Sequence, residues 1–214
     1  MISAQLVETF IIAFTTFFAT IGPVDVAVLY AAMTHGSSPQ AKRAMALRGS
    51  LIAFAILASF ALGGQLLLQT LGISLAALKV AGGILLLLIS IDMVFARNSG
   101  MTSTTDEEQD EAVHKQDVSV FPLATPLIAG PGAIGATMLL MANHQGQTLE
   151  QSAVFAALVA VIALTLLLLL LATQVQRLLG VTGMHVISRV FGVLLSALAV
   201  QFMFNGLKDS GLFG

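Results

Sequence analysis

Six long apolar stretches, separated by shorter polar segments, dominate the pattern of the chain. They cover residues 6–32, 47–69, 73–96, 118–141, 151–173 and 186–204. A helix that crosses the hydrocarbon core of a bilayer needs about 20 apolar residues, so each stretch is long enough to span a membrane. Glycine and proline fall inside continuous apolar runs, whereas transmembrane β-strands alternate polar and apolar residues. The pattern therefore predicts an all-α integral membrane protein with six transmembrane helices.

The polar segments are the expected connections between these helices. They cover residues 34–43, 70–72, 97–117, 144–150 and 174–183. The third is long and acidic, and we interpret it as a solvated loop. The chain is therefore expected to consist of a first three-helix unit at 1–96, the acidic loop at 97–117 and a second three-helix unit at 118–214.

Lysine and arginine gather at the first, third and fifth connections. These positions are Lys42, Arg43, Arg48, Arg97, Lys115, Arg177 and Arg189. Because cytoplasmic loops of membrane proteins are enriched in Lys and Arg, these connections, including the acidic loop, are predicted to be cytoplasmic. Both termini are then predicted to face outward.

Two glycine–proline motifs interrupt the first and fourth stretches, at Gly22-Pro23 and at Gly130-Pro131-Gly132. Proline removes a backbone donor and clashes with the preceding turn, while glycine lets the chain unwind. Unpaired backbone groups are costly in lipid, so such a break is expected inside protein or beside a wet cavity. For either break taken alone, a simple proline kink is the alternative.

The two breaks lie 108 residues apart, and similar offsets relate other segments. Leu71-Gly72 matches Leu179-Gly180, and KVAG at 79–82 matches RVFG at 189–192. Two related halves of three spans each would enter the membrane from opposite sides, which makes an inverted repeat. Inverted repeats with paired interrupted helices are typical of secondary transporters. The breaks are predicted to face each other at mid-membrane and to form a substrate site. Its backbone would come from Gly22, Pro23, Gly130, Pro131 and Gly132.

Asp25 and Lys79 are the ionisable residues of greatest interest within the spans. An acid inside a membrane span is costly and often marks a substrate or ion path. Asp25 is therefore a candidate for substrate binding, ion coupling or an ion pair with Lys79. It would attract the ammonium group of an amino acid and repel the carboxylate. A structural acid and a lysine that extends to the interface are the alternatives.

Small residues recur at every fourth position in two stretches. They are Ala55, Ser59 and Gly63 in the second stretch, and Ser188, Gly192 and Ser196 in the sixth. Such faces let membrane helices approach closely. They predict close contacts either within the bundle or between subunits of a homo-oligomer.

Composition excludes several classes of function. Hydrophobic residues make up 57% of the 214 residues and charged residues only 9%, with a net charge of −2 and no cysteine. A soluble domain carries about 25% charged residues, and a chain without excess positive charge is not expected to bind nucleic acid. The absence of cysteine excludes disulfides and thiolate metal sites. No metal and no cofactor are expected, and no ATP-binding GxxxxGK[ST] loop is present.

Three segments resemble the MarC family of bacterial inner-membrane proteins. They are FPLATPLIAGPGAI at 121–134, LGISLAALKVAGGILLLLISIDMVF at 71–95 and RVFGVLLSALAVQFMFNGL at 189–207. The resemblance implies six spans, periplasmic termini and an inner-membrane location, and some family members are described as transporters of small neutral amino acids. The chain departs from the family at Gly22, where members typically carry Asp or Asn before the proline, and at Lys79, where arginine is usual.

The sequence thus favours a secondary transporter of small neutral amino acids or similar metabolites, coupled to protons or sodium and open to an export role. A passive channel or facilitator, a family member without amino-acid transport, and a structural subunit are the alternatives. A membrane enzyme is disfavoured because no nucleophile–base pair or histidine cluster is evident. The expected partners are a small-molecule substrate, the lipid bilayer and, as an open alternative, further copies of the chain.

Overall fold

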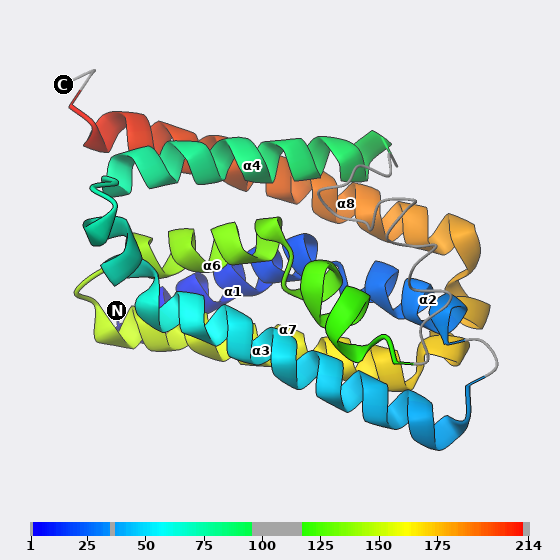
Figure 1. The fold of residues 1–214 in the computed structure, drawn as a ribbon. Helices are drawn as coiled ribbons and strands as arrows, with labels where there is room; N and C mark the ends of the chain where they lie inside the picture. The colour runs from blue at the N-terminus through cyan, green and yellow to red at the C-terminus, as the bar shows by residue number, and fades with distance from the viewer. Residues whose placement is uncertain (1, 35–36, 96–116, 212–214) are drawn as a thin grey trace.

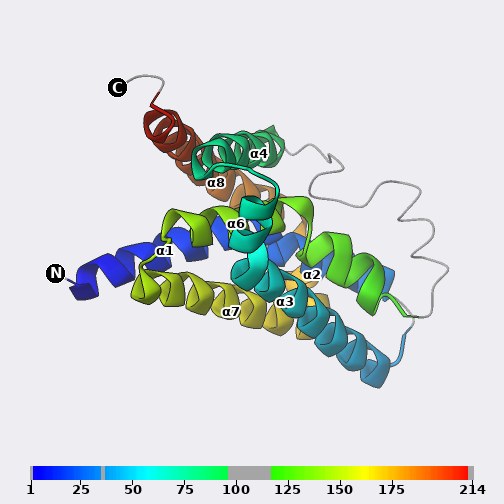
Figure 2. The same ribbon diagram turned by 60° about the vertical axis from the view of Figure 1, so that its left-hand side comes forward.

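The computed structural model describes residues 2–34, 37–95 and 117–211, and within them the regular structure is entirely helical. Most of the acidic loop predicted at 97–117 lies outside the described residues. The helices pack lengthwise into one bundle (Figures 1 and 2). They are α1 (Ile2–Ile21), α2 (Pro23–Met33), α3 (Pro39–Thr70), α4 (Leu75–Phe95), η1 (Ser119–Ile128), α6 (Pro131–Asn143), α7 (Thr148–Leu170) and α8 (Ala172–Asp209).

The helices have the length and hydrophobicity of membrane spans. Five described helical segments qualify on their own, and η1 with α6 forms a sixth candidate that is bent by 53°. Large leucines on the outer faces are exposed, with Leu62 at 76% and Leu51 at 68%, as expected for side chains that face lipid. The prediction of an all-α integral membrane protein is confirmed. The inverted relation between the halves, and the division into two three-helix units, stay predictions.

Two predicted connections are wholly or partly helical. Helix α3 already begins at Pro39, where the Ser38 hydroxyl accepts a hydrogen bond from the Ala41 N–H at 3.2 Å. Helix α8 begins at Ala172, so the connection predicted at 174–183 is helical, and it lies between the candidate spans Thr148–Leu170 and Arg189–Asp209. Glycine costs about 1 kcal/mol in a helix interior but does not by itself end one, which explains why Gly180 and Gly183 remain inside α8.

Helices α4 and α8 form the most extensive helix pair among the described elements and run antiparallel (Figure 1). Three small residues of α8 make this approach close. A β-carbon on Gly206 would lie 2.9 Å from the Ala76 carbonyl oxygen, and one on Gly192 would lie 3.1 Å from that of Ser90. Between them, the Ala199 carbonyl oxygen lies 2.8 Å from the place of a β-carbon on Gly83.

Gly192, Ala199 and Gly206 of α8 thus contact α4 at every seventh position, and Met203 adds a further contact at Gly83. This spacing differs from the stripe of every fourth residue that the sequence suggested for this helix. The stripe Ala55, Ser59 and Gly63 of α3 is exposed, and a β-carbon on Gly63 would meet nothing within 4 Å. Only one of the two predicted stripes therefore contributes a residue to a helix contact within the described bundle.

Candidate functional site at two interrupted helices

The first interruption separates α1 from α2 at Gly22. This glycine has a φ of +61°, a left-handed conformation that side chains with a β-carbon rarely adopt. Its N–H donates to the Phe18 carbonyl at 3.0 Å, and its own carbonyl accepts from the Val26 N–H at 2.9 Å. Pro23 is the first residue of α2 and cannot donate. The helical conformation is therefore broken at Gly22 alone, and helical hydrogen bonds are present before and after it.

The second interruption separates η1 from α6 and is sharper. Inside η1, a π-helix, Phe121 and Thr125 have extended backbone angles, and each precedes a proline in a cis peptide bond. Proline disfavours the helical region for the residue before it. The chain then turns at Gly130, where a β-carbon would lie only 2.5 Å from the Pro126 carbonyl oxygen. The sequence indicated one break in this span, whereas the structure adds two irregular residues before it, because three prolines act in succession.

The two breaks share a local pattern of hydrogen bonds. The Ile134 N–H donates to the Gly130 carbonyl at 3.0 Å, just as Val26 donates to Gly22. These residue pairs are related by the 108-residue offset found in the sequence. In each half-helix, the second and third residues therefore carry N–H groups that precede the first intrahelical donor.

The half-helices differ in charge at this position. Helix α2 has Asp25 in its first turn, and the carboxylate oxygen Oδ2 lies 3.4 Å from the place of a β-carbon on Gly22. A carboxylate at a helix N-terminus is stabilised by the helix dipole. Helix α6 has no acid in its first turn, and Gly130 offers no side chain as a cap. Its second and third residues, Gly132 and Ala133, are buried.

The bundle brings the two breaks together. Helix α1 packs on α6 and α2 packs on η1, so the junction of one pair lies beside the junction of the other (Figures 1 and 2). Five predicted site residues, Gly22, Pro23, Gly130, Pro131 and Gly132, lie at these junctions, and Asp25 lies in the first turn of α2. Gly132 and Ala133 of α6 are therefore buried at a junction that lies beside the junction of α1 with α2.

Helix α4 closes the site from another direction. The Cδ1 atom of Ile89 lies 2.4 Å from the place that a β-carbon on Gly132 would occupy, and Ile89 itself has no exposed surface. A side chain at position 132 would therefore require the end of Ile89 to move. Sequence reasoning missed Ile89 because an isoleucine in an apolar helix carries no chemical signature.

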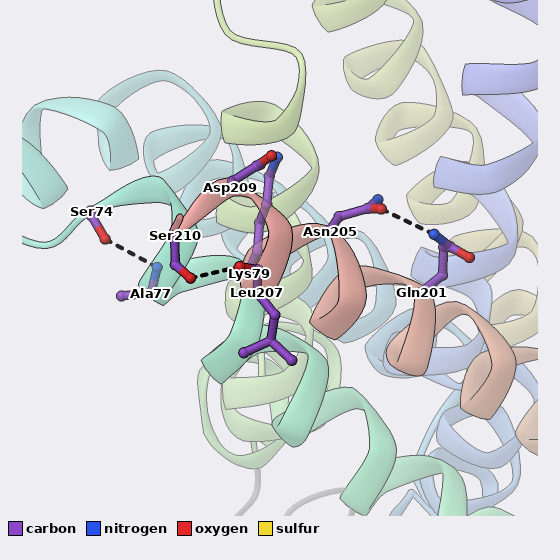
Figure 3. A network of polar contacts seen from close by, with 8 residues as sticks. All are labelled: Ser74, Ala77, Lys79, Gln201, Asn205, Leu207, Asp209 and Ser210. Atoms are coloured by element: carbon purple, nitrogen blue, oxygen red, sulfur yellow. Dashed lines mark hydrogen bonds and ion pairs between the residues drawn. The ribbon is translucent and has the colours of Figure 1, made fainter. Parts of the chain in front are cut away.

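Lys79 lies away from the breaks, near the start of α4. Its Nζ atom is 2.7 Å from Asp209 Oδ2 at the end of α8, and its side chain is 9% exposed against 47% for the aspartate (Figure 3). The sequence suggested Asp25 as a partner for Lys79, and that pairing stays a hypothesis. Asp209 was missed, although a lysine at the start of one span and an acid at the end of its antiparallel neighbour are a signal that could have found it.

A second ion pair lies at the opposite end of the bundle. Arg48 Nη1 of α3 contacts Asp117 Oδ2 at 2.7 Å, and the other oxygen of Asp117 accepts from the Ser119 N–H at 2.9 Å. Hydrogen bonding from Ser119, together with the positive charge of Arg48, holds the pKa of Asp117 below its ordinary value of 3.8. The start of η1 is thereby attached to α3. Nearby, the Tyr30 hydroxyl donates to the Lys42 carbonyl and links α2 to the same helix.

Among the described residues, no three His, Cys, Asp or Glu side chains lie close enough together to hold a metal ion. The described features that could bind a ligand are instead backbone groups at helix breaks and single charged side chains in apolar surroundings. The fold and the site thus define a multi-pass integral membrane protein built around two interrupted helices.

Comparison with known proteins agrees with this class. The model of the MarC family integral membrane proteins matches residues 7–210. The UPF0056 membrane protein MJ1677 of Methanocaldococcus jannaschii is 36% identical over 95% of this chain and 98% of its own length. YvbG of Bacillus subtilis is 36% identical over 94% of this chain and 93% of its own. YhcE of Escherichia coli is 32% identical over 94% of this chain and 91% of its own length. No solved structure matches significantly. The chain belongs to the MarC family.

Proposed function

We propose that this protein is a secondary transporter of small neutral amino acids or similar metabolites, rather than an enzyme. It would reside in a bacterial inner membrane with both termini in the periplasm. The observation that carries the proposal is the start of α6, where Gly132 and Ala133 are buried without a side-chain cap at a break that lies beside the break between α1 and the acid-bearing α2. Interrupted helices at the centre of a bundle are the usual site architecture of secondary transporters.

The charges favour a zwitterionic substrate. The N-terminus of α6 presents the N–H groups of Gly132 and Ala133 and the positive end of a helix dipole, which together suit a carboxylate. The N-terminus of α2 already carries the carboxylate of Asp25. We therefore place the substrate carboxylate at α6 and its ammonium group towards Asp25. A simple anion would gain the first contact but would be repelled by the second.

Transport by the purified protein in liposomes tests the proposal. Uptake of labelled alanine and glycine would be measured with and without imposed proton and sodium gradients. We expect gradient-dependent uptake that Asp25→Asn abolishes, because the amide loses both the attraction for ammonium and the capacity to bind a coupling ion. Asp92→Asn is the matched control, since it removes another acid from a span, near the far end of α4.

Each other outcome has a definite meaning. Substrate flux that depends on neither the proton nor the sodium gradient would indicate a passive facilitator and not a coupled carrier. Equal loss in both variants would show that Asp25 acts through general stability. Absence of uptake from a preparation that unfolds cooperatively on heating would contradict amino-acid transport.

A further inference from the structure

Ile89 of α4 is positioned to limit the space at the start of α6. Its Cδ1 atom stands 2.4 Å, and its Cγ1 atom 3.7 Å, from the place of a β-carbon on Gly132. Real β-carbons essentially never approach another atom within 3.0 Å, so a side chain at position 132 would require the end of Ile89 to shift. The apolar end of Ile89 thus lies against the backbone that would receive the substrate carboxylate.

The packing around Ile89 keeps it in this position. On the adjoining face of α4, a β-carbon on Gly192 of α8 would lie 3.1 Å from the Ser90 carbonyl oxygen, so α4 has little room to withdraw. Two turns earlier, Gly82 of α4 meets Leu139 of α6, with 3.0 Å between Leu139 Cδ2 and the place of a β-carbon. Ile89 is also β-branched, which leaves one strongly preferred χ1 rotamer in a helix. An apolar side chain whose branch point is held by the packing of α4 therefore lies beside the start of α6.

We propose that Ile89 determines the specificity of the site by limiting the size of the substrate side chain. This inference rests on the proposed function and adds the residue that would limit the substrate side chain to a hydrogen atom or a methyl group. A larger side chain on the α-carbon would meet Ile89 once the carboxylate is bound at Gly132 and Ala133. Shortening Ile89 should admit larger amino acids without removing the groups that bind the carboxylate or the ammonium.

The test compares four labelled substrates, glycine, alanine, valine and leucine, in liposomes containing wild type or Ile89→Ala. Wild type is expected to prefer glycine and alanine. In Ile89→Ala, the kcat/KM for valine relative to alanine should rise by about 10-fold or more, since one or a few methylene groups in an apolar pocket change discrimination by about 10- to 200-fold. Ile89→Val should give an intermediate ratio.

Leu139→Ala is the matched control. Leu139 is as fully buried as Ile89 and lies in the same α4–α6 contact, but two turns beyond the break. It should lower the unfolding temperature as Ile89→Ala does while leaving the valine-to-alanine ratio unchanged. An equal change of ratio in both variants, or no change in Ile89→Ala, would overturn the inference.

A size-exchange pair adds a second measurement. Gly132→Ala alone should lower the unfolding temperature and the alanine uptake, because its β-carbon meets Ile89. Combined with Ile89→Ala it should regain alanine uptake and lose less stability than the two single variants added together, and failure of either result would contradict the proposed contact. If wild type takes up none of the four amino acids, the proposed function fails and the size limit fails with it. If wild type takes up alanine and the ratio does not move, only the size limit fails.

Discussion

Asp25 and Ala133 occupy equivalent places in the two interrupted spans, since each is the third residue of the helix that starts after the break. One half-helix thus begins with its own carboxylate and the other begins without one. The difference gives the centre of the bundle a negative side chain beside a positive helix end. That polarity is the physical basis on which we propose a zwitterionic substrate.

Ala133→Asp should therefore block transport and leave the fold largely intact. The new carboxylate would sit at the helix N-terminus, where the dipole stabilises it, and would take the place of the substrate carboxylate. Ala136 lies one turn further along α6 and is equally buried. Ala136→Asp should instead lower the free energy of unfolding, because an uncompensated buried charge costs about 3–5 kcal/mol. Thermal unfolding and alanine uptake of both variants check this. Retained uptake in Ala133→Asp would argue against a carboxylate site at α6.

Gly22→Ala should separate backbone geometry from general stability. At a φ of +61° a β-carbon costs about 1–2 kcal/mol, and the nearest atom at 3.4 Å leaves room for it. Gly72 has a similar φ of +67° and lies in a turn between α3 and α4. A β-carbon on Gly72 would meet no atom within 4 Å. Both alanine variants should lose similar stability in thermal unfolding, but only Gly22→Ala should lose uptake. Parallel loss of uptake would remove any special role for the first break.

The Lys79–Asp209 pair should respond unequally to the loss of either partner. Asp209→Asn leaves a buried ammonium without its counter-charge, which costs about 1–3 kcal/mol or more. Lys79→Met keeps the packing of the aliphatic stem and leaves only a half-exposed carboxylate. The unfolding temperature should fall further in Asp209→Asn than in Lys79→Met. The opposite order would mean that the pair does not stabilise the contact between α4 and α8.

Acid should weaken the attachment of η1 to α3. The pKa of Asp117 is lower in the folded protein than its ordinary value, so its carboxylate stabilises the fold fully above the unfolded-state pKa of about 4. That stabilisation is lost as the pH falls through the folded-state pKa. Asp117→Asn should be less stable than wild type at neutral pH, by a modest amount because the pair is exposed, and the two should converge in acid. A difference that persists unchanged at low pH would exclude this origin.

The sequence predicts the membrane class, the number of spans and the positions of both breaks, because each rests on a strong local signal. Continuous apolar length identifies spans, and Gly-Pro inside such a length identifies a break. The helical course of 174–183 was missed since polar residues and glycine also fit a helix that continues beyond the apolar core. The contact of Ile89 with Gly132 and the pair of Lys79 with Asp209 depend on which helices become neighbours, and no local pattern contains that information.

If the paired breaks form the substrate site, their residues must be accessible to water and to substrate. Because the chain lacks cysteine, the variants Ala133→Cys and Ala157→Cys each provide one thiol, the first at the α6 break and the second in the middle of α7, both at positions that are buried. A membrane-impermeant, cationic thiol reagent should modify Ala133→Cys, and saturating alanine should slow the reaction, while Ala157→Cys should stay unmodified. If Ala133→Cys resists the reagent from both sides of the membrane, or reacts at a rate that neither alanine nor glycine changes, the breaks do not form the substrate site.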